Sequence, residues 1–437
     1  MVRRISLRTV AACVLAAAAV SAPSVIAAHT TPSAVSRQST NGQGHLAWVT
    51  SWAAMPQLTE PANLPPAPFT QPGHVLDDTT LRQTVHTSIG GHRLRLRFSN
   101  AFGGAPLPIT KVAVALPAGG AAGVSAIQPG SSRRVTFGGR PSTVIPTGAL
   151  MVSDPLDLNV PPQANVTVTL YLGAGQASDN ITSHPGSRTT SYLLRGDATH
   201  ATDLPGATPV DHWYFLSGLE VPAARRASAV ATLGDSLTDG RGSTTNANDR
   251  WPDQLLAHLQ TYGPTRDVAV INEAAGGNRV LNDGLGPNAL ARFDRDVIAQ
   301  SGVDSVIIFE GVNDIGTADA TPAAQQAVAD DLIGTYQQFV IRAHAEGIRI
   351  YGATLTPFGG NTMYGDPQGL RERTREAVNE WIRTSGQFDA VLDFDRAARD
   401  PQDPVRIRPD YDVGDHLHLN PAGYGALAAS VPARLFR

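Results

Sequence analysis

The 437-residue sequence contains almost no cysteine and almost no lysine: Cys13 and Lys111 are the only residues of their kinds. A chain with one thiol can form neither an internal disulfide nor a cysteine-built metal site, so packed apolar cores have to stabilise it. Acidic residues (38) slightly outnumber basic ones (34), which gives a formal net charge of −4. Because no general basic field exists, we expect no nucleic-acid partner.

The apolar run near the N-terminus is too short to span a membrane. Arg3, Arg4 and Arg8 precede an apolar stretch over 10–20, and small residues continue up to Ala28. The apolar stretch is about half of the ~20 residues that a membrane helix needs. We therefore expect a signal peptide that ends at residue 28, no stable membrane anchor and a secreted, extracellular protein.

Two alternatives remain open for this signal. Arg3-Arg4 followed by Leu7 partly fits a twin-arginine signal, so export by either this or the general secretory route is consistent with the sequence. The segment 10–13 resembles a lipoprotein cleavage box, but most of the apolar run follows Cys13, whereas such a box closes the run. Removal of the signal would take Cys13 with it.

Residues 29–45, rich in Ser, Thr, Gly and Gln, are predicted to be a flexible N-terminus. Residues 46–222 are predicted to form an accessory all-β domain of the sandwich or jelly-roll kind, because short alternating runs are separated by many Gly and Pro residues. In one such run Leu94, Leu96 and Phe98 alternate with Arg93, Arg95 and Arg97. We expect these arginines on a solvated strand face, and Gly90-Gly91 as a hairpin turn.

Residues 223–437 have a different pattern, in which apolar strands alternate with helices. The expected strands are 227–233, 268–271, 306–309, 350–355 and 391–394, and the expected helices are 251–259, one beginning at Pro322 after the N-cap Thr321, 373–382, and one after Pro421. This alternation predicts a parallel sheet with helices on both faces.

Polar residues follow these predicted strands. The segments are Gly234-Asp235-Ser236-Leu237, Asn272 with Gly276-Gly277-Asn278, Gly311-Val312-Asn313-Asp314, and Asp415-His416-Leu417-His418 before the last helix. Functional sites of parallel sheets lie at the carboxyl ends of the strands, so we expect these segments to meet.

Such residues supply what ester hydrolysis requires. A serine hydroxyl needs an adjacent imidazole to become a good nucleophile, and we assign Ser236 as nucleophile and His418 as general base. Asp415 can hold the other imidazole nitrogen. The negative charge of the tetrahedral intermediate needs donors, for which we expect the backbone N–H groups of Ser236 and Gly277 and the side-chain amide of Asn313.

The four segments resemble, in order, the conserved blocks of the SGNH hydrolases, also called GDSL lipases/acylhydrolases, over roughly 227–437. The resemblance implies a flavodoxin-like three-layer α/β/α fold, the same catalytic residues, and neither a cofactor nor a metal. Gly277 is preferred over Gly276 by its spacing from Asn272. The predicted all-β domain and the sequences Phe309–Asp314 and Thr354–Gly360 resemble those of secreted bacterial members of this family. These members include an arylesterase-like branch associated with xylan breakdown.

Neighbouring residues carry weaker expectations. Asn278 and Arg279 follow the oxyanion glycine, so they are candidates for substrate contact, with a solvated loop as the alternative. His416 is expected to be a structural or rim residue, and a metal bound by Asp415, His416 and His418 is the disfavoured alternative.

The sequence thus predicts a secreted serine esterase that removes small acyl groups, acetyl above all, from carbohydrate or other small esters. Its partner would be a small-molecule or polysaccharide ester. One alternative is a lipase or phospholipase acting on fatty esters. The other is a carbohydrate-binding protein whose hydrolase scaffold is inactive.

Overall fold

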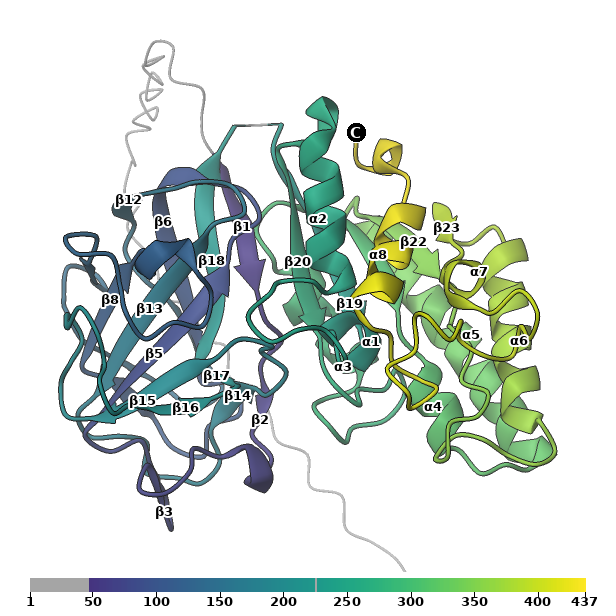
Figure 1. Ribbon diagram of the computed structural model, residues 1–437, viewed down its shortest axis with the longest axis horizontal. Coiled ribbons are helices and arrows are strands. Elements are labelled where there is room, and N and C mark those ends of the chain that lie inside the picture. The colour runs from purple at the N-terminus through teal and green to yellow at the C-terminus, as the bar shows by residue number, and fades with distance from the viewer. Residues whose placement is uncertain (1–46, 225) are drawn as a thin grey trace, which may run out of the picture. The chain divides into compact units, whose positions relative to one another are not determined.

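A computed structural model describes residues 47–224 and 226–437 of the chain (Figure 1). The predicted signal peptide (1–28) and flexible N-terminus (29–45) lie outside these residues. The described residues all belong to one compact unit. We call 47–224 the β region and 226–437 the α/β region.

The β region consists of antiparallel strands. One five-stranded sheet joins β1 (Ala47–Ala53), β18 (Leu216–Ala223), β6 (Gly91–Ser99), β11 (Leu150–Val152) and β12 (Leu156–Val160). A six-stranded sheet has the order β16 (Thr208–Val210), β15 (Ser191–Arg195), β5 (Thr79–His86), β13 (Asn165–Leu172), β8 (Lys111–Ala115) and β9 (Arg133–Val135). Small sheets join β17 (Trp213–Tyr214), β14 (Thr182–His184) and β2 (Gln57–Leu58), β10 (Thr143–Ile145) with β7 (Leu107–Ile109), and β3 (Thr70–Gln71) with β4 (His74–Val75). The short helices are η1 (Pro61–Asn63) and η2 (Ala118–Gly120).

The predicted hairpin at Gly90-Gly91 is wrong, because the strands on its two sides belong to different sheets. Strand β5 pairs with β13 and β15, whereas β6 pairs with β18, β11 and β12. The chain therefore crosses between sheets at this point. Gly90 is needed for a close approach: a Cβ there would lie 2.3 Å from the carbonyl oxygen of Val160.

The alternation in β6 is confirmed for the apolar side, since Leu94, Leu96 and Phe98 are fully buried. The expectation for the arginines holds only for Arg93. The side chains of Arg95 and Arg97 are 25% and 11% exposed and pair with the buried Glu220. A buried carboxylate on the neighbouring strand β18 draws them out of solvent, because an unpaired charge there would be costly.

The α/β region contains a five-stranded parallel sheet. Its order is β20 (Val268–Ala274), β19 (Ser228–Gly234), β21 (Val303–Phe309), β22 (Arg349–Ala353) and β23 (Ala390–Leu392). Numbered along the chain, this order is 2-1-3-4-5, which is known from flavodoxin-like folds. Each predicted strand is present within a few residues of its expected place. The strands read as apolar runs because they are almost entirely buried.

The helices of the α/β region fall into two packed groups (Figure 1). Helix α2 packs on β20 and α8, and α8 also contacts α7, whereas α5 packs on β22 and contacts α3, α4 and α6. Their bounds, with the remaining short helices, are α1 (Ser236–Asp239), α2 (Trp251–Thr261), η3 (Gly263–Thr265), α3 (Ala289–Phe293), η4 (Asp294–Ile298), α4 (Val312–Thr317), α5 (Pro322–Ala345), α6 (Leu370–Thr384), α7 (Phe394–Ala398), α8 (Pro421–Ser430) and η5 (Ala433–Phe436). Helix α5 begins as predicted, with Pro322 first and the Thr321 hydroxyl accepting from the Ala324 N–H. None of the helices in the described ranges combines the length and the apolarity needed to cross a bilayer.

Two apolar cores lie on either side of the predicted domain boundary. One collects residues of the α/β region together with Ala53, and the other collects residues of the β region together with Ala229 and Ala269. Strand β18 ends at Ala223 and β19 begins at Ser228, close to the predicted change at residue 222/223. The division into two domains itself stays a prediction.

A buried arginine joins the carboxyl ends of three parallel strands. The side chain of Arg292 is fully buried and donates to the carbonyl oxygens of Gly234 in β19 and Glu273 in β20, at 3.3 and 2.5 Å. It also pairs with Glu310, which follows β21, and with Asp296, each at 3.3 Å. One guanidinium therefore fixes the edge of the sheet at which the polar segments gather.

Replacing this arginine is expected to destabilise the fold. In Arg292→Ala the carboxyl groups around it lose their counter-charge, so the free energy of unfolding should fall by about 3–5 kcal/mol. Chemical denaturation of the purified chain measures this. The matched control is Arg266→Ala, whose side chain is exposed; a loss below about 1 kcal/mol in Arg292→Ala, as for a surface change, would contradict the role.

Candidate active site

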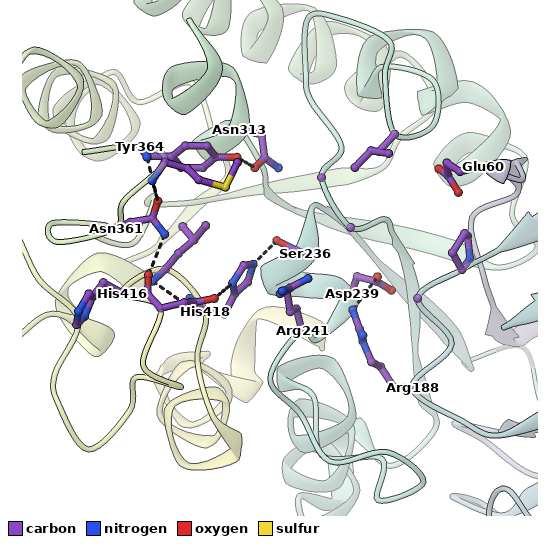
Figure 2. A pocket seen from close by; sticks show the side chains of 18 of the residues that line it. Glu60, Arg188, Ser236, Asp239, Arg241, Asn313, Asn361, Tyr364, His416 and His418 are labelled. Carbon is purple, nitrogen blue, oxygen red and sulfur yellow. Dashed lines mark hydrogen bonds and ion pairs between the residues drawn. The ribbon is translucent and has the colours of Figure 1, made fainter. Parts of the chain in front are cut away.

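The predicted nucleophile lies directly after the central strand β19. Asp235 is the N-cap of α1, and its carboxylate accepts from the backbone N–H of Leu237 at 2.9 Å. This cap turns the chain sharply, so that Ser236 begins the helix at the carboxyl edge of the sheet. The Ser236 side chain lines a cavity although the residue is only 6% exposed (Figure 2).

Ser236, His418 and Asp415 form one hydrogen-bonded chain. Ser236 Oγ lies 2.8 Å from His418 Nε2, and His418 Nδ1 lies 2.6 Å from Asp415 Oδ2. The other oxygen of Asp415 accepts from the backbone N–H groups of Leu417 and His418. Ser236 and His418 are 182 positions apart in the sequence, and the structure brings the three residues together as the sequence predicts. With Nδ1 donating to the carboxylate, Nε2 is free to accept the serine proton.

Burial and two nearby arginines keep the imidazole of His418 neutral. Burial is the largest influence and lowers the pKa of His418, while Asp415 acts in the opposite direction. The guanidinium groups of Arg241 and Arg188 lower the pKa of His418 further. Burial acts to raise the pKa of Asp415, but the hydrogen bonds from His418 outweigh it and lower that pKa. The base is therefore unprotonated and its partner is ionised at neutral pH.

The predicted oxyanion donors lie on two loops that are tied to each other. Asn313 Nδ2 donates to the carbonyl oxygen of Asn278 at 2.8 Å. The carboxylate of Asp314 accepts from the backbone N–H groups of Val280 and Leu281, both at 2.9 Å. These bonds hold the loop after β20 against helix α4. Asn313 is 3% exposed and lines the same cavity as Ser236.

Gly277 also lines this cavity, and its backbone conformation disfavours any residue with a side chain. Its φ is +73°, and a Cβ there would lie 2.3 Å from Cδ1 of Leu285. The neighbouring Gly276 lines the cavity too but lacks a positive φ. Among the described residues, the backbone N–H groups of Ser236 and Gly277 have no hydrogen-bond acceptor, so both remain able to donate to a bound ester.

Two residues that the sequence reasoning missed complete this side. The Tyr364 hydroxyl donates to Asn313 Oδ1 at 2.7 Å, which fixes the orientation of the Asn313 amide. Asn361 accepts from the Tyr364 N–H at 2.9 Å and donates to the carbonyl oxygen of Asp415 at 2.8 Å. Both lie in the loop that follows β22, so the rule that sites form at strand ends, applied to this fourth strand, would have indicated them.

Other predicted residues lie elsewhere. Asn278 is buried and does not line the cavity, because its side chain donates to two carbonyl groups and accepts from Arg292. Arg279 donates to the carbonyl oxygen of Asp283 and does not line the cavity either. His416 lies on the rim and bonds Asp412 at 2.6 Å. Within residues 47–224 and 226–437, no group of three or more His, Cys, Asp or Glu side chains is placed to hold a metal ion.

The cavity has a volume of about 770 Å³ and two walls. The α/β region supplies Ser236, Gly277, Asn313 and His418, and the β region supplies a second set that the sequence did not predict: Gln57, Glu60, Asn63, His184, Gly186 and Arg188. The size is that of a site for a small organic ligand or part of a polymer.

A buried pair connects the second wall to the nucleophile. His184 Nε2 lies 3.0 Å from Asp239 Oδ1, and Asp239 is the last residue of α1. His184 Nδ1 lies 3.0 Å from the carbonyl oxygen of Met55, and the ring stacks on Trp213 of β17. Burial acts to raise the pKa of Asp239, but His184 and the neighbouring Arg188 and Arg250 outweigh it, so the pKa is lowered. The short helix that carries Ser236 is thus held from the β region.

A serine within bonding reach of a neutral, carboxylate-oriented imidazole, next to an amide and free backbone donors, is suited to acyl transfer. The family model described as "GDSL-like Lipase/Acylhydrolase family" matches residues 232–426. This part of the chain is a GDSL-like lipase/acylhydrolase domain with an α/β fold, as its sequence motifs predicted, and the protein is a carboxylic ester hydrolase.

Several solved structures are similar to about half of this chain at low identity. A variant of an acetyl xylan esterase from Geobacillus stearothermophilus is 21% identical, with a TM-score of 0.36, over 47% of this chain and 94% of the other. A G-D-S-L family protein from Desulfitobacterium hafniense is 20% identical, with a TM-score of 0.36, over 48% and 99%. A GDSL-like lipase from Bacteroides thetaiotaomicron is 17% identical, with a TM-score of 0.34, over 46% and 84%. A comparison with curated proteins found no match.

The lowered pKa of His418 predicts the pH dependence of activity. Protonation of Nε2 removes the base, so kcat/KM should be constant at neutral pH and fall in acid, with a midpoint below the ordinary histidine value of 6.5. Arg241→Gln removes one positive charge near the ring and should move the midpoint upward. The measurement is kcat/KM for p-nitrophenyl acetate from about pH 4 to 8; a midpoint above 6.5 in the wild type would contradict the assignment.

The Tyr364–Asn313 contact predicts graded effects on kcat. Asn313→Ala removes one donor to the developing oxyanion and should lower kcat by about 10²–10³-fold. Tyr364→Phe keeps the ring but releases the Asn313 amide, so we expect a smaller fall of about tenfold, the value of roughly one hydrogen bond. In the double variant the two effects should not add, because both act through one amide. Steady-state kinetics on one ester would show this, and fully additive losses would rule out the coupling.

Proposed function

We propose that this protein hydrolyses esters through an acyl-enzyme on Ser236 and that its substrates carry small acyl groups, acetyl above all, on carbohydrate or other small polar alcohols. The observation that carries the proposal is the hydrogen-bonded chain from Ser236 Oγ to His418 Nε2 (2.8 Å) and from His418 Nδ1 to Asp415 (2.6 Å), in a cavity lined mainly by residues with polar side chains.

Each catalytic step follows from this geometry. His418 Nε2 takes the proton of Ser236 as Oγ attacks the ester carbonyl carbon. The resulting oxyanion accepts from the N–H groups of Ser236 and Gly277 and from the Asn313 amide. The intermediate collapses when His418 gives the proton to the departing alcohol. Water then repeats the sequence on the acyl-enzyme, which releases the carboxylic acid and restores Ser236.

The lining of the cavity favours a polar substrate with a short acyl chain. Its large apolar side chains are few, and two of them, Leu285 and Met363, are 49% and 77% exposed. Long acyl chains need an extended apolar surface to be bound out of water. Hydrolysis of fatty esters is therefore the second candidate.

The remaining expectations form part of the same proposal. The charged and apolar pattern of residues 1–28 supports export of the protein. The strand order 2-1-3-4-5 and the two helix groups support a flavodoxin-like three-layer arrangement for 223–437. The antiparallel sheets support an accessory β domain of the sandwich or jelly-roll kind over 46–222.

Substitution of the nucleophile tests the mechanism. Ser236→Ala should lower kcat for p-nitrophenyl acetate by about 10⁴-fold or more, whereas Ser430→Ala, at an exposed serine of α8, should have no effect. Equal rates for wild type and Ser236→Ala would remove Ser236 from the reaction and leave a binding protein as the better description.

A series of p-nitrophenyl esters tests the acyl group. We expect kcat/KM to be highest for acetate and to decline through butanoate to octanoate, because few of the residues that line the cavity have large apolar side chains to cover a longer chain. A clear preference for octanoate would overturn the small-acyl assignment in favour of a lipase.

A further inference from the structure

The wall of the cavity opposite the catalytic histidine holds a fixed carboxylate. Glu60 accepts from Gln57 Nε2 at 2.5 Å and from Asn63 Nδ2 at 3.0 Å. Both donors are neutral amides, and within the described residues Glu60 has no ion-pair partner. Figure 2 shows Glu60 and Arg188 on the side of the cavity away from His416 and His418. The acyl-transfer steps use neither residue.

Arg188 adds a cation with unused donors to the same wall. Its nearest carboxylate contact, to Asp239 Oδ2, is long at 3.5 Å, and its side chain is 30% exposed where it lines the cavity. Its backbone has a φ of +51°, which is unfavourable for a residue with a side chain. Strained backbone that persists in a fold is typical of ligand sites.

This wall is held rigidly by the β region. Thr59, next to Glu60, donates from its backbone to Ile181 and from its hydroxyl to Ser183. The carbonyl oxygen of Asn63 accepts from the hydroxyl of the buried Tyr214 at 2.8 Å. The polar groups therefore keep their places before a ligand arrives, which reduces the entropic cost of binding.

We propose that Glu60, supported by Gln57 and Asn63, and Arg188 form a subsite for the alcohol half of the ester, and that this alcohol is a neutral, polyhydroxylated molecule such as a sugar ring. Hydroxyl groups donate to a carboxylate and accept from a guanidinium, so a polyol carries groups that match both residues. Glu60 would repel an alcohol that carries a negative charge, and Arg188 and Arg241 would repel one that carries a positive charge. This inference rests on the proposed function, and it makes the β region part of the enzyme's specificity.

Esters with one acyl group and different alcohols test the subsite. The full-length enzyme is assayed with acetylated xylobiose, acetylcholine and p-nitrophenyl acetate. The wild type should prefer acetylated xylobiose to acetylcholine. In Glu60→Gln and in Arg188→Gln, the ratio of kcat/KM for acetylated xylobiose to that for p-nitrophenyl acetate should fall by about 10- to 100-fold, mainly through KM, as the loss of hydrogen bonds to a charged group implies.

Matched controls are Glu346→Gln and Arg266→Gln, at exposed positions outside the cavity, which should leave the ratio as in wild type. A ratio within about twofold of wild type in either cavity variant overturns the subsite, and so does a wild-type preference for acetylcholine. These results differ from a failure of the proposed function, which would appear as p-nitrophenyl acetate turnover that persists in Ser236→Ala.

Binding of the product alcohol gives a readout without turnover. Xylobiose titrated calorimetrically into Ser236→Ala should bind, and binding should weaken when Arg188→Gln is added to this background. The proposal is overturned if xylobiose does not bind to Ser236→Ala, or if it binds equally well to Ser236→Ala and to the Ser236→Ala, Arg188→Gln double variant. This test does not require that Glu60→Gln folds.

Discussion

The site depends on one buried cation, Arg292. Its guanidinium contacts the carbonyl groups that end β19 and β20, the carboxylate that follows β21, and the side chain of Asn278 in the oxyanion loop. Burial raises the pKa of Glu310 to about 7, although Arg292 acts against it. A buried carboxyl group can be ionised only beside a compensating charge, which Arg292 supplies here. The three strand ends that deliver the nucleophile and the oxyanion donors are thus fixed through a single side chain that touches none of the reacting atoms.

In addition to Arg292, two sets of hydrogen bonds hold the neighbouring loops together as one site. Asp314 holds the loop of Gly277 against α4, and burial raises its pKa to about 6 even though two backbone N–H groups act to lower it. Tyr364 orients Asn313 and, through Asn361, connects the oxyanion side to Asp415. Catalytic groups need positions accurate to a fraction of an ångström, and here the accuracy comes from hydrogen bonds between loops rather than from the strands alone.

The sequence predicted the parallel sheet and the meeting of Ser236, Asn313, Asp415 and His418, because apolar runs and polar strand ends are local patterns. It could not predict pairings that depend on which strands become neighbours. The prediction of a hairpin at Gly90 was wrong because a Gly-Gly pair indicates a turn but not whether the next strand joins the same sheet. Asn278 was misjudged because a polar loop residue looks the same whether its amide faces substrate or bonds to carbonyl groups and a buried arginine. The β region contributes His184 and Glu60 to the cavity through contacts between residues that are far apart in the sequence. No local sequence motif indicates such contacts.

The β region reaches the cavity because it covers the edge strand of the parallel sheet. Strand β20 lies at the edge of the sheet, and an uncovered edge exposes backbone groups that would pair with other chains. Strand β1 packs beside it, and Ala54 forms a parallel bridge with Asn272. Because β1 runs parallel to β20, the chain leaves β1 at the carboxyl edge of the sheet, where Ser236 lies, and continues directly into Gln57 and Glu60. Covering an exposed edge and building the second wall of the catalytic cavity are therefore consequences of the same strand placement.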